Sequence, residues 1–183
     1  MALTYSNQMH VGVAAPPFHL PGVDGRMYSL DSFADAKALI VIFTCNHCPY
    51  AIALEDRIIA IQHDYTDRGV QIVAINPNED GNYPEDSFEM MIERAKEKNF
   101  PFPYLRDESQ EVAKAYQAAC TPDPFVFDEK RKLVYNGRID DNWKDPNNVT
   151  QRDMRTVLDC VLAKKPIPFE PKPAMGCSIK WKY

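Results

Sequence analysis

The chain has 183 residues, of which 45% are hydrophobic and 26% charged, and its formal net charge is −5. This length suits one domain with a substantial core, and the acidic balance argues against nucleic acid or an anionic membrane surface as a partner. No apolar run approaches the roughly 20 residues of a membrane span. Residues 1–13 lack the basic start and apolar core of a signal sequence, so we expect a cytoplasmic protein.

The first 38 residues predict a short extension ahead of the main fold. Two short strands are expected, one within 14–21 and one at 26–30, joined by the Gly-Val-Asp-Gly turn at 22–25. Asp31 then opens a short helical turn.

A buried strand is predicted at 39–44, because its apolar run is too short and too β-branched for a helix. A C-x-x-C pair follows directly, and Pro49 lies in the first turn of the next helix, where a missing N–H costs least. This helix is expected to reach about Arg68. A second buried strand at 71–76 would complete a βαβ unit with parallel strands.

The remaining chain is expected to continue as alternating helices and strands. Thr150 and Asp153 resemble a capping box at the start of the last helix. We divide the chain into a domain at 1–163 and an extended arm at 164–183, since four prolines fall within 164–174. In chain order, the elements predicted after 71–76 are a helix at 85–98, a strand at 102–105, a helix at 109–118, a hairpin of strands at 125–128 and 133–139, and a helix at 151–163.

Cys45 and Cys48 are predicted to lie at the carboxyl end of the first core strand, where the helix begins. Free N–H groups and the positive end of the helix dipole favour a thiolate there. A C-x-x-C cysteine in this setting has its pKa lowered from ~8.5 to roughly 3.5–7.5. We therefore predict Cys45 as the nucleophile and Cys48 as the thiol that resolves the mixed disulfide. His47, as an imidazolium, would further stabilise the Cys45 thiolate.

The five cysteines lack the regular spacing of a secreted disulfide framework. A lone C-x-x-C beside a β-α pattern is typical of a redox pair. The alternative is a zinc site, which would need two further ligands, and only Cys120 and Cys177 could supply them. We predict no metal and no cofactor.

Residues 14–163 resemble the thioredoxin-like superfamily. The run Ala-Pro-Pro-Phe-His-Leu-Pro-Gly-Val-Asp-Gly-Arg at 15–26 is similar to the redoxin branch, which includes the peroxiredoxins. Phe-Thr-Cys-Asn-His-Cys-Pro-Tyr at 43–50 together with Gly-Cys-Ser-Ile-Lys-Trp-Lys at 176–182 is similar to a peroxiredoxin-like group that carries a C-x-x-C motif. The resemblance implies an α/β thioredoxin-like fold, with a central mixed sheet, helices on both faces and an N-terminal extension.

The resemblance also implies roles for individual residues. Cys45 becomes the nucleophile, Cys48 the resolving thiol, and Pro122 a cis-proline packed against the cysteine pair. The backbone of Thr121 would then face outward and pair with a substrate's extended chain. Thr121 and Asn46 are thus candidate substrate-binding residues. The implied partners are protein or small-molecule disulfides and a thiol reductant.

Departures from the family patterns bear on the activity. Leu39 stands where thioredoxins carry a buried acid, so removal of the Cys48 proton must use another group or water. A His beside the second cysteine resembles the disulfide isomerases and predicts a redox potential above that of thioredoxin. The Pro-x-x-x-Thr-x-x-Cys loop of peroxiredoxins is missing, and Arg138 is more typical of a solvated strand residue than of a peroxide-binding guanidinium. A thiol-disulfide oxidoreductase is the main prediction; a peroxide reductase and a non-catalytic binding module are the alternatives.

Two more cysteines are candidate redox thiols. Cys120 adjoins Pro122 and is expected near the C-x-x-C pair, either as a redox thiol or as a small buried hydrophobe. Cys177 could return over the site on the arm, with a Cys120–Cys177 pair as the natural form; a purely structural arm is the simpler alternative. Cys160 is predicted to be a core residue. Asn76 and Asn78 are candidates to border the site, because α/β sheets bind ligands at this edge.

Overall fold

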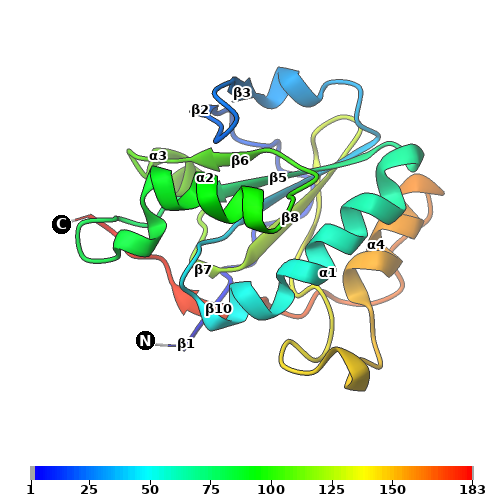
Figure 1. Ribbon diagram of the computed structural model, residues 1–183. Coiled ribbons are helices and arrows are strands. Elements are labelled where there is room, and N and C mark those ends of the chain that lie inside the picture. Colours follow the sequence, from blue (N-terminus) through cyan, green and yellow to red (C-terminus); the bar gives the residue numbers. More distant parts are fainter. Residues whose placement is uncertain (1–2, 183) are drawn as a thin grey trace.

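The structure is a computed structural model that describes residues 3–182. Its centre is a five-stranded mixed sheet with the strand order β6-β5-β4-β8-β9 (Figure 1). β4 pairs with β5 in parallel and with β8 antiparallel. The strands are β4 (Ala38–Phe43), β5 (Val70–Asn76), β6 (Tyr104–Arg106), β8 (Asp123–Asp128) and β9 (Leu133–Asn136).

Strand β4 is buried on both faces, as its uninterrupted apolar run predicts. Successive side chains alternate between the two faces of the sheet, so Ile40 and Ile42 enter one core cluster while Leu39 and Val41 enter the other. Each fully buried aliphatic side chain contributes about 1.5–3 kcal/mol. The strand that carries the cysteine pair is therefore the rigid centre of the domain.

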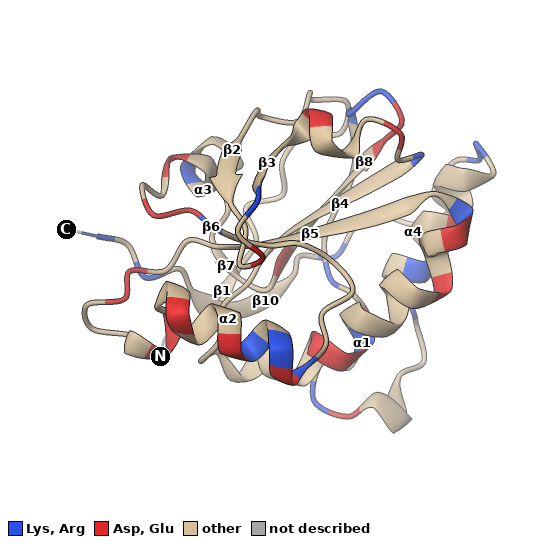
Figure 2. Cartoon of the chain, turned by 45° about the horizontal axis from the view of Figure 1, so that its top comes forward, with Lys and Arg blue, Asp and Glu red and all other residues tan. Residues whose placement is uncertain are grey.

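Helices cover both faces of this sheet. α1 (Pro49–Tyr65), α2 (Phe88–Glu97) and α4 (Asp153–Leu162) contribute buried side chains to the first cluster. α3 (Glu111–Ala115) and the N-terminal segment contribute to the second. Charged side chains lie along the helices, whereas β4 and β5 carry none on their central run (Figure 2). None of the helices within residues 3–182 has the length and apolarity needed to cross a membrane.

The N-terminal extension forms a hairpin of β2 (His19–Pro21) and β3 (Met27–Ser29), followed by a 3₁₀ turn at Leu30–Phe33. These elements agree with the prediction. Further 3₁₀ turns lie at Thr66–Arg68, Pro84–Asp86 and Pro146–Asn148.

A second, small sheet joins three distant parts of the chain. β1 (Leu3–Tyr5), β10 (Met175–Ser178) and β7 (Cys120–Thr121) pair antiparallel in the order β1-β10-β7. Figure 1 shows β10, in red, beside the cyan first turn of α1. The sequence analysis predicted neither β1 nor β10. The arm at 164–183 is thus tied into the domain by backbone pairing at β10.

Helices α2 and α4 differ from the prediction at their starts. α2 begins at Phe88, because Pro84–Asp86 form a separate 3₁₀ turn and Ser87 caps the helix by accepting from Met90 N–H. The expected capping box ahead of α4 does not form. The hydroxyl of Thr150 donates to Asp141, and Asp153 is paired with Arg138.

Candidate active site

Cys45 and Cys48 lie in the short connection between β4 and α1, where the sequence places them. Cys48 is the N-cap residue of α1 and Pro49 its first helical residue. Cys45 is 5% exposed and Cys48 0% exposed. Both residues are thus buried, with Cys45 slightly the more exposed of the two.

Thr121 contacts both sulfurs from the opposite side of the site. Its hydroxyl oxygen lies 3.2 Å from Cys45 Sγ, and its carbonyl oxygen accepts a hydrogen bond of 3.0 Å from Cys48 Sγ. The peptide bond from Thr121 to Pro122 is cis, which agrees with the predicted conformation. The hydroxyl can donate to a Cys45 thiolate while the carbonyl accepts the Cys48 proton. Hydrogen bonding to Thr121 lowers the pKa of both thiols.

Strand β10 occupies the backbone edge of Thr121. Cys177 is the residue paired with Thr121, and a Cβ placed on the neighbouring Gly176 would lie only 2.0 Å from the Thr121 carbonyl oxygen. The expectation that this backbone edge is open to a substrate is therefore wrong. A segment of the chain itself fills the place predicted for the substrate.

Cys177 joins Cys45, Cys48 and Ala51 in one buried cluster. Cross-strand partners point to the same face of a sheet, so Cys177 lies on the Thr121 side, next to the C-x-x-C pair.

Cys120 is directed away from this cluster. It is paired with Ser178 on β10, and neighbouring residues of a strand point to opposite faces. The predicted Cys120–Cys177 pair is therefore not supported by the register. Burial raises the pKa of the Cys120 thiol, as for a small buried hydrophobe. Cys160 is only partly buried, in contrast to its prediction as a core residue.

His47 forms an ion pair with Asp86. His47 Nδ1 lies 2.6 Å from the carboxylate, whose side chain is fully buried. This hydrogen bond raises the pKa of His47, although burial opposes it. Burial alone would raise the pKa of Asp86, but hydrogen bonds from His47, Asn78 and the Asn46 N–H hold it below its usual value. Tyr83 stacks on the imidazole with a centroid separation of 5.0 Å.

Asp86 is the residue of the site that sequence reasoning missed. The helix predicted at 85–98 places Asp86 in its first turn, as an acid that favours the helix dipole. The only signal was an acid in a Pro-Glu-Asp-Ser turn beyond Asn76 and Asn78, the residues expected to border the site. Both asparagines do hydrogen-bond Asp86, at 3.3 Å and 2.8 Å.

The side chain of Asn46, a predicted substrate-binding residue, holds the same loop in place. Its amide donates to the Glu85 carbonyl at 2.8 Å and accepts from the Tyr104 hydroxyl at 3.0 Å. Because both ends of its amide are bonded within the protein, the Asn46 side chain positions the loop and does not offer a free group to a substrate.

The two thiols of the pair titrate as a unit. The pKa of Cys48 is lowered to about 4, mainly by the hydrogen bond from Cys45 and with help from Cys177 and the Ala51 N–H, against the effect of burial. The same bond raises the pKa of Cys45, as do burial and the charge of Asp86. The expectation of a low pKa for Cys45 therefore needs correction. The pair holds one thiolate charge, and helix contacts draw that charge toward Cys48.

Three atoms that could bind a metal lie within 4.8 Å of one another, from Cys45, His47 and Asp86. The histidine Nδ1 and the carboxylate are already bonded to each other. A metal ion bound through these two atoms would have to displace that bond.

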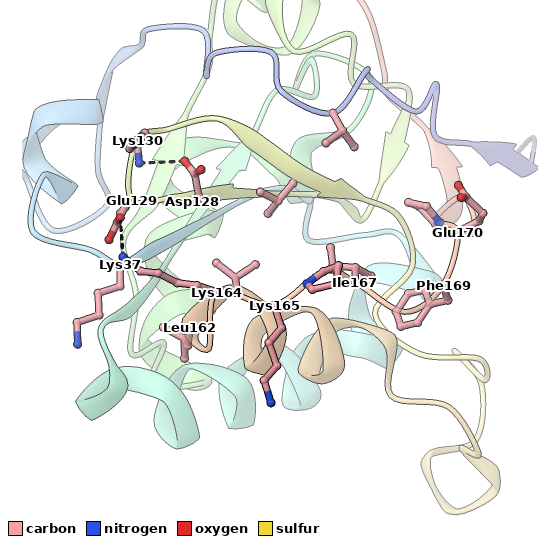
Figure 3. A pocket seen from close by; sticks show the side chains of 15 residues that line it. Lys37, Asp128, Glu129, Lys130, Leu162, Lys164, Lys165, Ile167, Phe169 and Glu170 are labelled. Atoms are coloured by element: carbon pink, nitrogen blue, oxygen red, sulfur yellow. Dashed lines mark hydrogen bonds and ion pairs between the residues drawn. The ribbon is translucent and has the colours of Figure 1, made fainter.

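A larger groove lies away from the thiols, and a small hollow adjoins Cys45. A groove of about 640 Å³ is lined by the β8–β9 turn, the end of α4 and the segment at 164–171 (Figure 3). None of the five cysteines lines it. Beside Cys45 there is a hollow of only about 20 Å³, with Asn46 and Tyr104 in its wall. This volume accommodates about one water-sized molecule.

Comparisons with known proteins agree with this architecture. The Redoxin family profile matches residues 10–158. An uncharacterised conserved protein of Geobacillus kaustophilus is 46% identical, with a TM-score of 0.94 over 100% of this chain and 97% of its own. A thiol:disulfide interchange protein of the thioredoxin family from Chlorobium tepidum TLS shares the fold at 19% identity, with a TM-score of 0.64 over 85% of this chain and 99% of its own.

A curated relative is similar over a shorter span. The thiol-disulfide oxidoreductase ResA of Geobacillus thermodenitrificans is 27% identical over 133 residues, which are 71% of this chain and 70% of that protein. The family profile covers most of the sequence, including β4, the cysteine pair and Pro122. The chain therefore belongs to the redoxin family of thioredoxin-like redox proteins.

Proposed function

We propose that this protein is a thiol-disulfide oxidoreductase that cycles Cys45 and Cys48 between dithiol and disulfide. The observation that carries the proposal is the placement of both sulfurs at the first turn of α1, where Thr121, next to the cis-proline, contacts each of them. The curated relative named a thiol-disulfide oxidoreductase supports it.

The reaction begins with the proton of the pair on Cys48 and the charge on Cys45. Cys45 Sγ attacks one sulfur of a substrate disulfide, whose S–S bond breaks, and the other half leaves as a thiolate that takes up the Cys48 proton. Cys48 Sγ then attacks Cys45 Sγ and expels the second thiolate. The substrate gains two electrons and the protein retains a Cys45–Cys48 disulfide, which an external thiol reductant returns to the dithiol.

Three residues hold this pair in position. Thr121 contacts both sulfurs, as described above, and so assists the proton exchange between them. The pKa of His47 is raised by its hydrogen bond to Asp86 and in part by the Cys48 charge, which favours a positive charge beside the pair. These residues act on the thiolate through hydrogen bonds and charge and transfer no electrons.

A trapping experiment tests the proposal. In Cys48→Ser the mixed disulfide cannot be resolved, so oxidised glutathione should leave one glutathione on Cys45, visible by mass spectrometry and removed by dithiothreitol. Cys45→Ser should capture none. Cys160→Ser is the matched control, because it removes a partly buried thiol outside the site and should leave the wild-type reaction intact. A Cys48→Ser protein without an adduct would favour a non-catalytic binding module.

The hollow beside Cys45 favours one alternative, peroxide reduction. Hydrogen peroxide is close to water in size, and the hollow has room for about one such molecule. Cys45 thiolate would attack the peroxide to give a sulfenic acid and hydroxide, and Cys48 would then form the disulfide and release water. Stopped-flow mixing with hydrogen peroxide separates the two. Loss of the Cys45 thiol much faster than that of Cys160 would support peroxide reduction. Loss at the rate of an ordinary thiol would exclude it.

A further inference from the structure

The C-terminal strand brings a third thiol to the cysteine pair. Pairing of β10 with β7 sets Cys177 directly across from Thr121, the residue that contacts Cys45 and Cys48. Cys177 is 3% exposed and lies in the same buried cluster as both cysteines. The sulfurs of Cys45 and Cys48 are therefore potential reaction partners for its own sulfur.

Strand β10 is fixed in this position on both sides. β1 pairs with its other edge, and Ile179 N–H donates to the Ala119 carbonyl at 3.2 Å. Lys180 N–H donates to Asn78 Oδ1 at 2.9 Å. At Gly176 the strand approaches the Thr121 carbonyl more closely than any side chain would allow. The position of Cys177 is thus a property of the folded domain.

Within the cluster, Cys48 is the neighbour of Cys177. Hydrogen bonding to Cys177 lowers the pKa of Cys48, and the same contact raises the pKa of Cys177. Cys48 also hydrogen-bonds Cys45, so its sulfur lies between two others. Thiol–disulfide exchange needs this arrangement, in which a thiol faces one sulfur of an existing disulfide.

We propose that Cys177 is a third redox thiol of this site, which takes over the disulfide from Cys45–Cys48. This proposal rests on the proposed function. Cys177 Sγ attacks Cys48 Sγ, a Cys48–Cys177 bond forms, and the Cys45–Cys48 bond breaks with its electron pair leaving on Cys45. The proton of Cys177 passes to Cys45, and the exchange needs no external oxidant or reductant.

Oxidation of Cys48 removes one cause that opposes a thiolate on Cys177. Burial, the hydrogen bond to Cys48 and the charge of Cys48 together raise the pKa of Cys177 to about 12 in the reduced site. A Cys48 sulfur within a disulfide carries no charge, which removes one of these causes. Lys180 acts in the opposite direction and lowers the pKa of Cys177.

The exchange changes what Cys45 can do. Cys45 becomes a thiol again while Cys48 is held in a buried disulfide. A second substrate disulfide that reacts with Cys45 then has no internal resolving thiol and must be released by an external one. Cys177 thereby converts the protein from a dithiol enzyme to a monothiol enzyme with a stored disulfide.

Disulfide mapping of a Cys45→Ser protein tests this without relying on the Cys45–Cys48 cycle. Treatment with the thiol oxidant diamide should remove two of its four remaining thiols and give one peptide pair joined through Cys48 and Cys177. The double variant Cys45→Ser, Cys120→Ala should form the same Cys48–Cys177 disulfide. The double variant Cys45→Ser, Cys177→Ala should form no intramolecular disulfide. Retention of all four thiols, or a Cys48–Cys120 link, would overturn the proposal.

The wild-type chain provides a second measurement. Oxidation by glutathione disulfide and acid trapping should show both the Cys45–Cys48 and the Cys48–Cys177 disulfides, whereas Cys177→Ala should show only the first. If Cys48→Ser captures glutathione while no Cys48–Cys177 disulfide forms, the third thiol is refuted and the proposed function stands. If the Cys48–Cys177 disulfide forms but no glutathione is captured, the proposed function fails on its own.

Discussion

Gly176→Ala tests the contact that places β10 against the active site. The added Cβ would lie 2.0 Å from the Thr121 carbonyl oxygen and 2.6 Å from its carbonyl carbon. Both are backbone atoms, so no side chain can rotate away to make room. Strand β10 must therefore move away from β7.

The size of the effect follows from this geometry. Non-bonded heavy atoms need about 3.5 Å, so the strand has to retreat by roughly 1.5 Å. Such a shift lengthens the β7–β10 hydrogen bonds beyond a useful distance, at about 1 kcal/mol each. Overpacking in a buried site costs about 1–3 kcal/mol. We expect the free energy of unfolding to fall by about 2–4 kcal/mol, which leaves a domain of ordinary stability folded.

Denaturant unfolding measures this change, with Gly81→Ala as its control. Gly81 is exposed, and its added Cβ would meet only the carboxylate of Glu79 at 3.3 Å, so its stability should change by less than about 0.5 kcal/mol. Amide exchange at Ile179 should also accelerate in Gly176→Ala. Equal stability of the two variants would mean that β10 does not press against Thr121, and the account of Cys177 would lose its basis.

Three further predictions concern single side chains. Asp86→Asn removes the main cause of the raised His47 pKa, so NMR titration should show this pKa falling, and stability near neutral pH should drop by about 1.5–3 kcal/mol with the lost charge-assisted bond. Burial raises the pKa of Asp123 to about 7. Between pH 4 and 7 the folded state keeps a proton on Asp123 that the unfolded state has lost. The free energy of unfolding should therefore fall by up to about 4 kcal/mol as the pH rises from 4 to 7. Cys120→Ala added to Cys48→Ser should capture as much glutathione as Cys48→Ser alone.

Each of these has an outcome that contradicts it. An unchanged His47 titration in Asp86→Asn would mean that the ion pair does not control the imidazole. The His47 contribution should be present at low pH and lost as pH rises through its raised folded pKa, so the opposite slope would also count against it. A carboxyl resonance of Asp123 that titrates near 4 would remove its pH effect. Loss of adducts in Cys120→Ala would restore Cys120 as a redox thiol.

The core of the fold could be predicted because its signals are local. The apolar run of β4 fixes a strand buried on both faces, and Pro49 directly after Cys48 fixes the start of a helix. Strand β5, seven residues long, follows with the same composition. These features determine where the cysteine pair lies, and the structure agrees with each of them.

The surroundings of the pair could not be predicted, because they depend on long-range contacts of short segments. β10 has four residues, one of them Gly176, and a strand this short has no periodic pattern of its own. Its pairing with Thr121 joins residues more than 50 positions apart. Asp86 contacts His47 from a turn 39 residues away. Glu85, the acid beside it, looks equivalent in the sequence but does not make this contact. Burial of one acid of the two is decided by tertiary packing.

These long-range contacts also bear on the redox balance of the site. Contacts that hold a thiolate lower its pKa and stabilise the reduced pair, and a stabilised reduced form makes the disulfide a stronger oxidant. The sequence suggested such a bias from His47 alone. The structure adds the Cys177 thiol and the Ala51 N–H, both of which lower the pKa of Cys48, while Asp86 raises the pKa of the His47 imidazole. Because Asp86 also raises the pKa of Cys45, the thiolate of the pair is favoured on Cys48. For Cys45 to attack a disulfide as proposed, its proton must therefore first pass to Cys48, so that the charge moves to the attacking sulfur.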